Sequence, residues 1–401
     1  MKKADAPLGG ISVEHFLARF WQRRPLLVRG AMPAAVPVPG PDALLALAAR
    51  DDVESRLVRR AGRAWTLDHG PFDADGLPPR TRAGWTLLVQ GVDLHDDAAA
   101  ALLRRFAFLP HARVDDLMIS YASDRGGVGP HVDSYDVFLL QAHGRRRWRI
   151  APPAEHAFEP GLPLRILQRF EPTEDWVLEP GDMLYLPPGW AHDGQAMGEC
   201  TTCSIGFRAP SRGELLRAFL ADACERVPDD GPRFRDAARA RAGRPGALPA
   251  DLRAFARESV ARWRPSARQV DEFLGRFLTE PKASVFFDAP ARPAARGAFE
   301  QRAAGTGVAL DRRSRMLVDG PTAYLNGETV RATAAGARAL LARLADARRL
   351  SGEQAARAAA AGDCGAHLYD WYRAGWLHVA RAAETADGPR RPAPQPVRRP
   401  R

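Results

Sequence analysis

Hydrophobic and polar positions change their spacing twice along the chain. Between residues 65 and 207 the apolar residues form short runs separated by glycine and proline, and after residue 210 they recur at helical spacing. Runs typical of β-strands occupy residues 85–89, 118–121, 137–140, 148–150 and 176–178. Because many short strands with turn residues between them favour packed or closed sheets, this part is predicted to be an antiparallel sandwich or barrel.

Ahead of these strands the pattern predicts two helices and one further strand. Ser12 can cap a helix that Pro25 would stop, and the apolar residues 26–28 then form a strand. Pro41 stands where a second helix can begin, before a leucine-rich stretch. We expect this segment to belong to the same unit as the strands, over residues 1–208.

A helical region is expected over residues 209–289. Apolar stripes at helical spacing cover residues 215–220 and 270–278, and the segment between them, 227–249, has the composition of a loop. Such stripes usually pack into a core. A helical insert between two domains has little core of its own, however, so a dimer interface is the alternative.

A third unit is expected over residues 290–387. Apolar residues on both sides of Asp319 and Gly320 predict a hairpin, and helical segments follow around residues 334–347, 351–360 and 369–376. A hairpin beside small helices indicates a winged-helix-like α+β domain, a shape that binds nucleic acid in some proteins and docks proteins in others. Residues 388–401 are rich in proline and arginine, so we expect a disordered tail there.

Composition narrows the class of protein without identifying a partner. The net charge is +10, and arginine carries nearly all the positive charge because lysine occurs only at positions 2, 3 and 282. This basicity reflects either composition or a phosphate-rich partner such as RNA, and direct nucleic-acid binding stays open. No apolar run reaches the roughly 18 residues that a membrane span needs, and no signal peptide is evident, so we expect a cytoplasmic protein.

The most informative motif is a pair of histidines with one aspartate. His131 and Asp133 are two residues apart, so on a strand they point to the same side, and His192 follows a second strand and turn. Two imidazoles and one carboxylate on one face of a metal leave the opposite face open, which is typical of mononuclear non-haem Fe(II) oxygenases. The sequence therefore predicts that these three residues bind iron.

Strand alternation also selects an anchor for an anionic cosubstrate. A 2-oxoacid can chelate such a metal and leave a position for O2, but its distant carboxylate needs a cation inside the barrel. In the arginine-rich run 145–149, Arg146 shares its side with Trp148 and Ile150, which should face the interior. A guanidinium pairs with a carboxylate through two parallel hydrogen bonds, so Arg146 is the predicted anchor.

Other polar residues are expected to line the same cavity. Alternation places Thr202 and Ser204 toward it, and Ser120 at the end of another strand is a similar donor. Tyr135 shares the parity of His131 and Asp133 and could line the substrate entrance. Asp124, in the preceding loop, could meet a cationic substrate side chain.

Residues 126–150, read with 181–192 and 204–210, resemble the JmjC-type ribosomal oxygenases, and among them the bacterial ribosomal protein arginine hydroxylases. The resemblance extends to residues 20–30 and 85–93, so it covers roughly the first half of the chain. It implies a mainly β double-stranded β-helix of the cupin or jelly-roll type, then an α-helical dimerisation region and a winged-helix-like C-terminal domain. The later parts match mainly in order and length.

The resemblance also implies a chemistry and a partner. It implies Fe(II) at His131, Asp133 and His192, with the cosubstrate 2-oxoglutarate held by Arg146, Ser120 and Thr202. The family often has asparagine where this chain has Thr202. The implied reaction uses O2 to hydroxylate the β-carbon of an arginine in the sixteenth protein of the large ribosomal subunit. Under this interpretation Asp124, Tyr135 and Ser204 hold the arginine side chain, and the protein is a homodimer.

Two other functions stay open at this point. Related enzymes hydroxylate histidine, demethylate lysine or modify tRNA, so the same chemistry could act on another target. A metal-containing cupin without catalytic activity, which binds RNA or DNA through its C-terminal domain, belongs to a different class. Turnover of 2-oxoglutarate that depends on iron and is lost in His131→Ala would separate the two classes.

Overall fold

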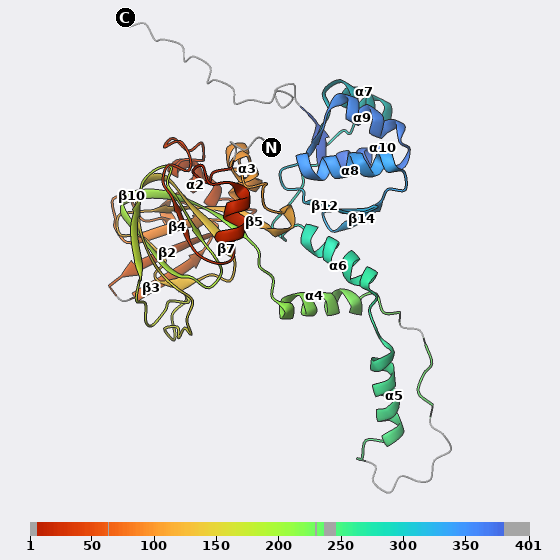
Figure 1. Cartoon of the computed structure of the whole chain (residues 1–401), viewed down its shortest axis with the longest axis horizontal. Helices are drawn as coiled ribbons and strands as arrows, with labels where there is room; N and C mark the ends of the chain where they lie inside the picture. The colour runs from red at the N-terminus through yellow and green to blue at the C-terminus, as the bar shows by residue number, and fades with distance from the viewer. Residues whose placement is uncertain (1–5, 63, 229–230, 236–245, 381–401) are drawn as a thin grey trace, which may run out of the picture.

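The computed structural model describes residues 6–62, 64–228, 231–235 and 246–380, in three successive parts (Figure 1). The first is rich in strands, the second consists of helices, and the third mixes helices with short strands. The predicted tail, 388–401, lies outside the described residues. The division at residues 208, 289 and 387 stays a prediction. Among the described residues, every helix is too short or too polar to span a lipid bilayer.

The first part is built on a ten-stranded antiparallel sheet, which confirms the predicted β architecture. Its strand order is β1-β9-β7-β10-β5-β4-β2-β3, with β6 on β10 and β8 on β7. The strands are β1 (Leu26–Val28), β2 (Ser55–Ala61), β3 (Ala64–His69), β4 (Trp85–Val89), β5 (Val114–Ala122), β6 (His131–Val132), β7 (Asp136–Ala151), β8 (Glu174–Leu178), β9 (Met183–Leu186) and β10 (Ala191–Phe207). Three helices accompany them, namely α1 (Val13–Arg19), α2 (Pro41–Ala48) and α3 (Asp97–Arg104).

Alternation along β5 and β10 separates an aromatic core from a cavity. Leu117 and Ile119 of β5, with Ile205 and Phe207 of β10, are fully buried in a cluster that α1 closes with Phe16. The residues between them point the other way and line the cavity, among them Met118, Ser120, Ser204 and Gly206. Because one face of each strand is fixed by the core, the other face presents a fixed set of polar groups.

Strand β5 contains a β-bulge at its start. Ile205 pairs with Leu117 and Phe207 pairs with Val114, so Asp115 and Asp116 both lie opposite the single residue Gly206. In a bulge, two residues of one strand face one residue of its partner, and the extra residue alters the direction of nearby side chains. Here the bulge brings two adjacent carboxylates to the cavity wall.

The helical region contains α4 (Arg212–Cys224), α5 (Ala250–Arg262) and α6 (Ala267–Thr279). Serines cap α4 and α6, which cover the two predicted apolar stripes; α6 buries Phe273, whereas α4 buries no residue. Helix α5 was not predicted. In Figure 1 it projects away from both neighbouring parts. The described residues between 227 and 249 form neither helix nor strand, which agrees with the predicted loop.

The C-terminal part is an α+β domain with its own core of Phe299, Leu341, Leu344, Leu368 and Trp371. The predicted hairpin is present as β12 (Met316–Asp319) and β13 (Thr322–Leu325), and β14 (Glu328–Arg331) extends it. A second sheet joins β11 (Val308–Leu310), β15 (Arg349–Leu350) and β16 (Leu377–Val379). The helices are α7 (Arg296–Thr306), α8 (Ala335–Ala347), α9 (Gly352–Ala360) and α10 (Asp363–Arg373). Helix α10 begins six positions before the predicted 369, because the sequence break falls at Gly362.

Candidate metal centre and its cavity

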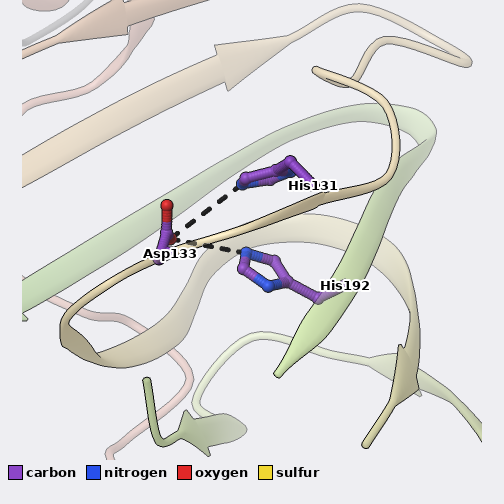
Figure 2. Close-up of side chains that lie close together, drawn as sticks. All are labelled: His131, Asp133 and His192. Atoms are coloured by element: carbon purple, nitrogen blue, oxygen red, sulfur yellow. Dashed lines mark ion pairs between the residues drawn. The ribbon is translucent and has the colours of Figure 1, made fainter. Parts of the chain in front are cut away.

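Three predicted ligands meet at one point of the sheet-rich part. His131 and His192 are direct partners across the β6–β10 pair, and Asp133 lies just past the end of β6 rather than within a strand. The Nε2 atoms of His131 and His192 lie 4.0 Å and 3.6 Å from Oδ2 of Asp133. Figure 2 shows both rings directed at this carboxylate. All three ligand atoms lie within 4.8 Å of one another, which is close enough for one metal ion.

Hydrogen bonds fix which nitrogen of each histidine can bind a metal. The Nδ1 atom of His131 lies 2.9 Å from the carbonyl oxygen of Gly129, and Nδ1 of His192 lies 3.0 Å from that of Trp190. A carbonyl can only accept, so each Nδ1 carries the proton and each Nε2 presents a lone pair. This is the outer-shell arrangement that commonly orients metal-binding imidazoles.

Burial keeps the second imidazole neutral. The side chain of His192 is only 3% exposed, and burial together with the nearby His131 lowers the pKa of His192 to about 4. Only the neutral form of imidazole can bind a metal. At neutral pH His192 is therefore ready to bind without first losing a proton.

The three ligands open onto a cavity of about 300 Å³. Several of its lining residues carry buried donor atoms that have no hydrogen-bond partner among the described residues, namely Arg56 Nε, Thr86 Oγ1, Arg146 Nε and Nη2, and Trp148 Nε1. Buried polar atoms are rarely left without partners in native proteins. A polar ligand in this cavity would satisfy them.

Arg146 occupies the position predicted for the cosubstrate anchor. It is 5% exposed and lines the cavity, whereas Arg145 and Arg147 are exposed, as alternation predicted. Its Nη1 donates to Ser120 Oγ at 3.2 Å, while Nε and Nη2 are left without partners. A carboxylate is the natural acceptor for such a pair of free guanidinium donors. The residues present therefore fit 2-oxoglutarate.

Thr202 is directly opposite Ser120 in the β5–β10 register, but it does not line the cavity. Its side chain is fully buried, and its hydroxyl donates to Gln141 Oε1 at 2.9 Å. The predicted contact of Thr202 with 2-oxoglutarate therefore has no direct geometric support. Ser120 donates to the backbone oxygen of Thr202 at 3.4 Å and accepts from Arg146, so it links the two.

The residues predicted to hold the substrate also divide into those that line the cavity and one that does not. Tyr135 and Ser204 line the cavity, as expected. Asp124 does not: its side chain is half exposed, and it accepts a hydrogen bond from the backbone of Gly198 and pairs with Arg125. Asp124 therefore lies outside this cavity, and its predicted contact with the substrate has no geometric support here.

Sequence reasoning missed the aspartates that do reach the cavity, Asp115 and Asp116. Regular alternation sends neighbouring strand residues to opposite faces, so the two adjacent aspartates were not predicted to line one cavity together. One signal was present, however. Two polar residues stand between the apolar Val114 and Leu117, which breaks the period of two and indicates a bulge.

The two aspartates differ in their ionisation. For Asp116, burial outweighs the attraction of Lys282 and raises the pKa of its carboxyl group. For Asp115, burial acts in the same direction, but the cations Lys282 and Arg208 outweigh it and lower the pKa. The wall next to Tyr135 therefore carries a negative charge that depends on neighbouring cations.

Comparison with known proteins agrees with this geometry. Residues 101–215 match the model of the JmjC domain family, and residues 261–378 match that of the ROXA-like winged helix. The ribosomal protein uL16 3-hydroxylase of Escherichia coli is 36% identical over 79% of this chain and 84% of its own length. A probable ribosomal oxygenase of Haemophilus influenzae is 36% identical over 55% of each chain.

Solved structures show the same architecture. The crystal structure of E. coli YcfD superposes with a TM-score of 0.79 at 31% identity, over 92% of this chain and 98% of that one. A structure of the same ribosomal oxygenase in complex with cobalt and 2-oxoglutarate superposes with a TM-score of 0.77 at the same identity and coverage.

Proposed function

The chain belongs to the JmjC-domain ribosomal oxygenases, and on that premise we propose that it hydroxylates the β-carbon of an arginine in ribosomal protein uL16. Like its family, it is a 2-oxoglutarate-dependent oxygenase that uses Fe(II) and O2. The observation that carries the choice of target is the pair of carboxylates at the cavity wall, because these suit a cationic side chain.

His131, Asp133 and His192 would hold the iron. Two imidazoles and one carboxylate would leave coordination positions of the iron open for the cosubstrate and oxygen. The bound iron supplies the oxidising chemistry that no protein side chain can provide. The carbonyl oxygens of Gly129 and Trp190 accept from Nδ1 of the two imidazoles and so would orient each Nε2 toward the metal.

Arg146 and Ser120 would bind the far carboxylate of 2-oxoglutarate. The two free donors of Arg146 match the two oxygens of a carboxylate, and Ser120 holds the guanidinium in place at 3.2 Å. Trp148 packs near Arg146, with 5.6 Å between the guanidinium carbon and the ring centre, and keeps that end of the cavity apolar. Exclusion of water there strengthens the charge pairing.

Other residues of the same cavity would hold the arginine of the substrate. Asp116, Asp115, Tyr135 and Ser204 all line the cavity and offer carboxylates and hydroxyls to a planar guanidinium. A guanidinium has five donors in a fixed plane, so several acceptors around one pocket are needed to satisfy it. A hydroxyl such as that of Ser204 can accept as readily as donate.

Mass spectrometry of the reaction product tests this function. The purified chain is incubated with Fe(II), 2-oxoglutarate and recombinant uL16, and we expect a gain of one oxygen on a single arginine. The His131→Ala variant should give no gain. Oxygen incorporated at a histidine would contradict the proposed target. So would a result in which uL16 gains no oxygen while another protein stimulates the release of succinate.

We further propose that the protein is a homodimer that works in the cytoplasm, where ribosomal proteins are made. Helix α4 has no buried residue and exposes Leu216 (57%) and Leu220 (41%), while Trp263 after α5 is 40% exposed. The apolar residues that these helices leave exposed favour burial against a second chain. Sedimentation velocity should show a dimer that dissociates when Leu216 and Leu220 are replaced by glutamate, but not after Arg343→Glu on α8.

A further inference from the structure

A lysine from outside the sheet-rich part reaches the wall of the cavity. Lys282 lies in the segment after α6, and its Nζ atom is 3.1 Å from Asp116 Oδ2 and 3.3 Å from Asp115 Oδ1. It is one of three lysines in the chain and the only lysine among the described residues. One ammonium group thus bridges both carboxylates that the bulge in β5 presents.

The segment that carries Lys282 is held firmly. At the end of α6, Thr279 is fully buried and its hydroxyl accepts a hydrogen bond from the backbone of Gly327, in the turn between β13 and β14. The carbonyl of Lys282 accepts from the backbone of Val285 at 2.9 Å. The segment that carries the ammonium is therefore anchored outside the strands that form the cavity, in part by the β13–β14 turn of the C-terminal domain.

Nearby donors leave one oxygen of Asp116 available. Oδ2 accepts from Lys282, from the backbone of Gly91 at 3.2 Å and from Gln90 Nε2 at 3.3 Å. Gln90 is itself oriented by Arg56, which donates to its Oε1 at 3.0 Å. No donor among the described residues reaches Oδ1. The carboxylate is thus fixed by one oxygen, and the other is free for a ligand.

We infer that Lys282 is a positioning residue for substrate recognition: it keeps the adjacent aspartates together and charged so that they can receive a cationic side chain. Two adjacent carboxylates repel each other, and without a cation one of them would take up a proton or turn away. This inference rests on the proposed function, since it is the bound arginine that would use the pair. It assigns part of the substrate pocket to the chain beyond the JmjC domain.

The substitution Lys282→Met tests the inference, with Lys282→Arg as the variant that keeps the charge. We expect the KM for uL16 to rise roughly tenfold in Lys282→Met, with kcat and the KM for 2-oxoglutarate changed less than about twofold. Lys282→Arg should recover most of the loss. Succinate release without protein substrate does not use the acidic wall, so it should stay at the wild-type rate in both variants.

Arg312→Met is the matched control. Arg312 of the C-terminal domain pairs with Asp97 of α3 at 2.6 Å, so it also links this domain to the sheet-rich part, but it does not line the metal-site cavity. If loss of any ion pair between the two parts raised the KM, this variant would do so as well. We expect a wild-type KM.

The pH profile provides a readout that general loosening of the structure would not change. Removal of Lys282 should move the acidic limb of kcat/KM for uL16 to higher pH, because the aspartates then ionise less readily, and Lys282→Arg should restore it. The other charged or titratable groups around the pair are Asp93, Tyr135, Arg208, Arg315 and, through Gln90, Arg56. These are the same in all variants.

Each outcome decides the matter. An unchanged or lower KM in Lys282→Met, with normal wild-type activity, would overturn the inference and leave the proposed function intact. An equal rise in Arg312→Met would also overturn it. If Lys282→Met fails to fold, the KM for uL16 of Lys282→Gln and the pH profile of Lys282→Arg replace it as the test. A wild-type enzyme that leaves uL16 unmodified would overturn the proposed function, and the inference with it.

Discussion

The guanidinium of Arg146 is held to the hydroxyl of Ser120 at 3.2 Å by a single hydrogen bond, and its other inward donors are buried without partners among the described residues. A cation arranged in this way has lost its water and has not regained equivalent bonds. The arrangement is stable only if an anion regularly completes it.

Arg146→Met should therefore weaken binding of 2-oxoglutarate more than any other step. Truncation of one partner of a buried charge pair typically costs about 2–5 kcal/mol, so the KM for 2-oxoglutarate should rise roughly thirtyfold or more. The neighbouring Arg145 is exposed, and Arg145→Met should leave this KM unchanged. Initial rates of succinate formation over a range of 2-oxoglutarate concentrations measure both; equal effects in the two variants would contradict the anchor.

Loss of a metal ligand should abolish metal binding without unfolding the protein. His131 is partly exposed at the end of a short strand, so His131→Ala removes little of the core. Metal affinity should fall by more than the roughly 10–100-fold typical of outer-shell changes. Calorimetric titration with a divalent metal measures this. His143→Ala, a substitution at an exposed histidine, is the control and should bind normally.

Gly206 faces the two aspartates across the bulge, and its substitution should affect the substrate alone. A Cβ atom there would lie 3.7 Å from Asp115 Cβ and 3.8 Å from Tyr135 Cε2, which are ordinary contacts. Gly206→Ala should keep its stability but raise the KM for uL16 roughly tenfold, because one methyl group enters the pocket.

The contrasting substitution is Gly194→Ala. A Cβ at this position would lie 2.6 Å from the ring of Trp148, so the fold must shift. Overpacking of this kind costs about 1–3 kcal/mol of unfolding free energy. Thermal unfolding of both variants checks the difference, and a lower midpoint for Gly206→Ala than for Gly194→Ala would contradict it.

Stability should depend on pH through Asp93. Burial and the neighbouring Asp116 raise the pKa of Asp93 to about 6, against 3.8 without these effects. Between about pH 4 and pH 6 the folded protein then binds more protons than the unfolded chain, so this residue's contribution to stability is present at low pH and is lost as pH rises through 6.

Asp93→Asn should remove this dependence. An amide oxygen can still accept from the backbone of Leu117, as the carboxylate does at 2.8 Å. Relative to wild type, the variant should gain a few kcal/mol of unfolding free energy between about pH 4 and pH 7, since each pKa unit corresponds to about 1.4 kcal/mol. Urea unfolding of both proteins across this range measures the difference; parallel curves would show that Asp93 titrates normally.

The sequence predicted those parts of the site that follow from spacing along one strand. His131 and Asp133 could be read as a pair because i and i+2 share a side, and Arg146 could be separated from its neighbours by the same rule. Alternation indicates which face of a strand a side chain lies on, but not whether the side chain reaches the cavity. Thr202 was therefore expected to face the cavity together with Ser204, yet it is fully buried and does not line the cavity.

Contacts between distant segments could not be predicted in this way. The approach of Lys282 to Asp116 depends on how α6 and the β13–β14 turn pack, and no local pattern encodes that distance. Helix α5 was missed because it has no strong apolar stripe and buries no residue. In the C-terminal domain, the hairpin and helices α8 and α9 were predicted nearly correctly, whereas α10 was predicted to begin six positions too late and α7 was missed.

The extra residue in β5 suggests how the specificity of such an enzyme can diverge. Leu117 belongs to the core and Val114 packs against it on the other side of the bulge, so deletion of one aspartate would restore an unbroken strand without displacing either. A single-codon deletion would thus remove one of the two carboxylates from the pocket, while the three iron ligands, which lie outside β5, stay where they are. In this scaffold, insertions and deletions, and not only point substitutions, provide a route to new targets.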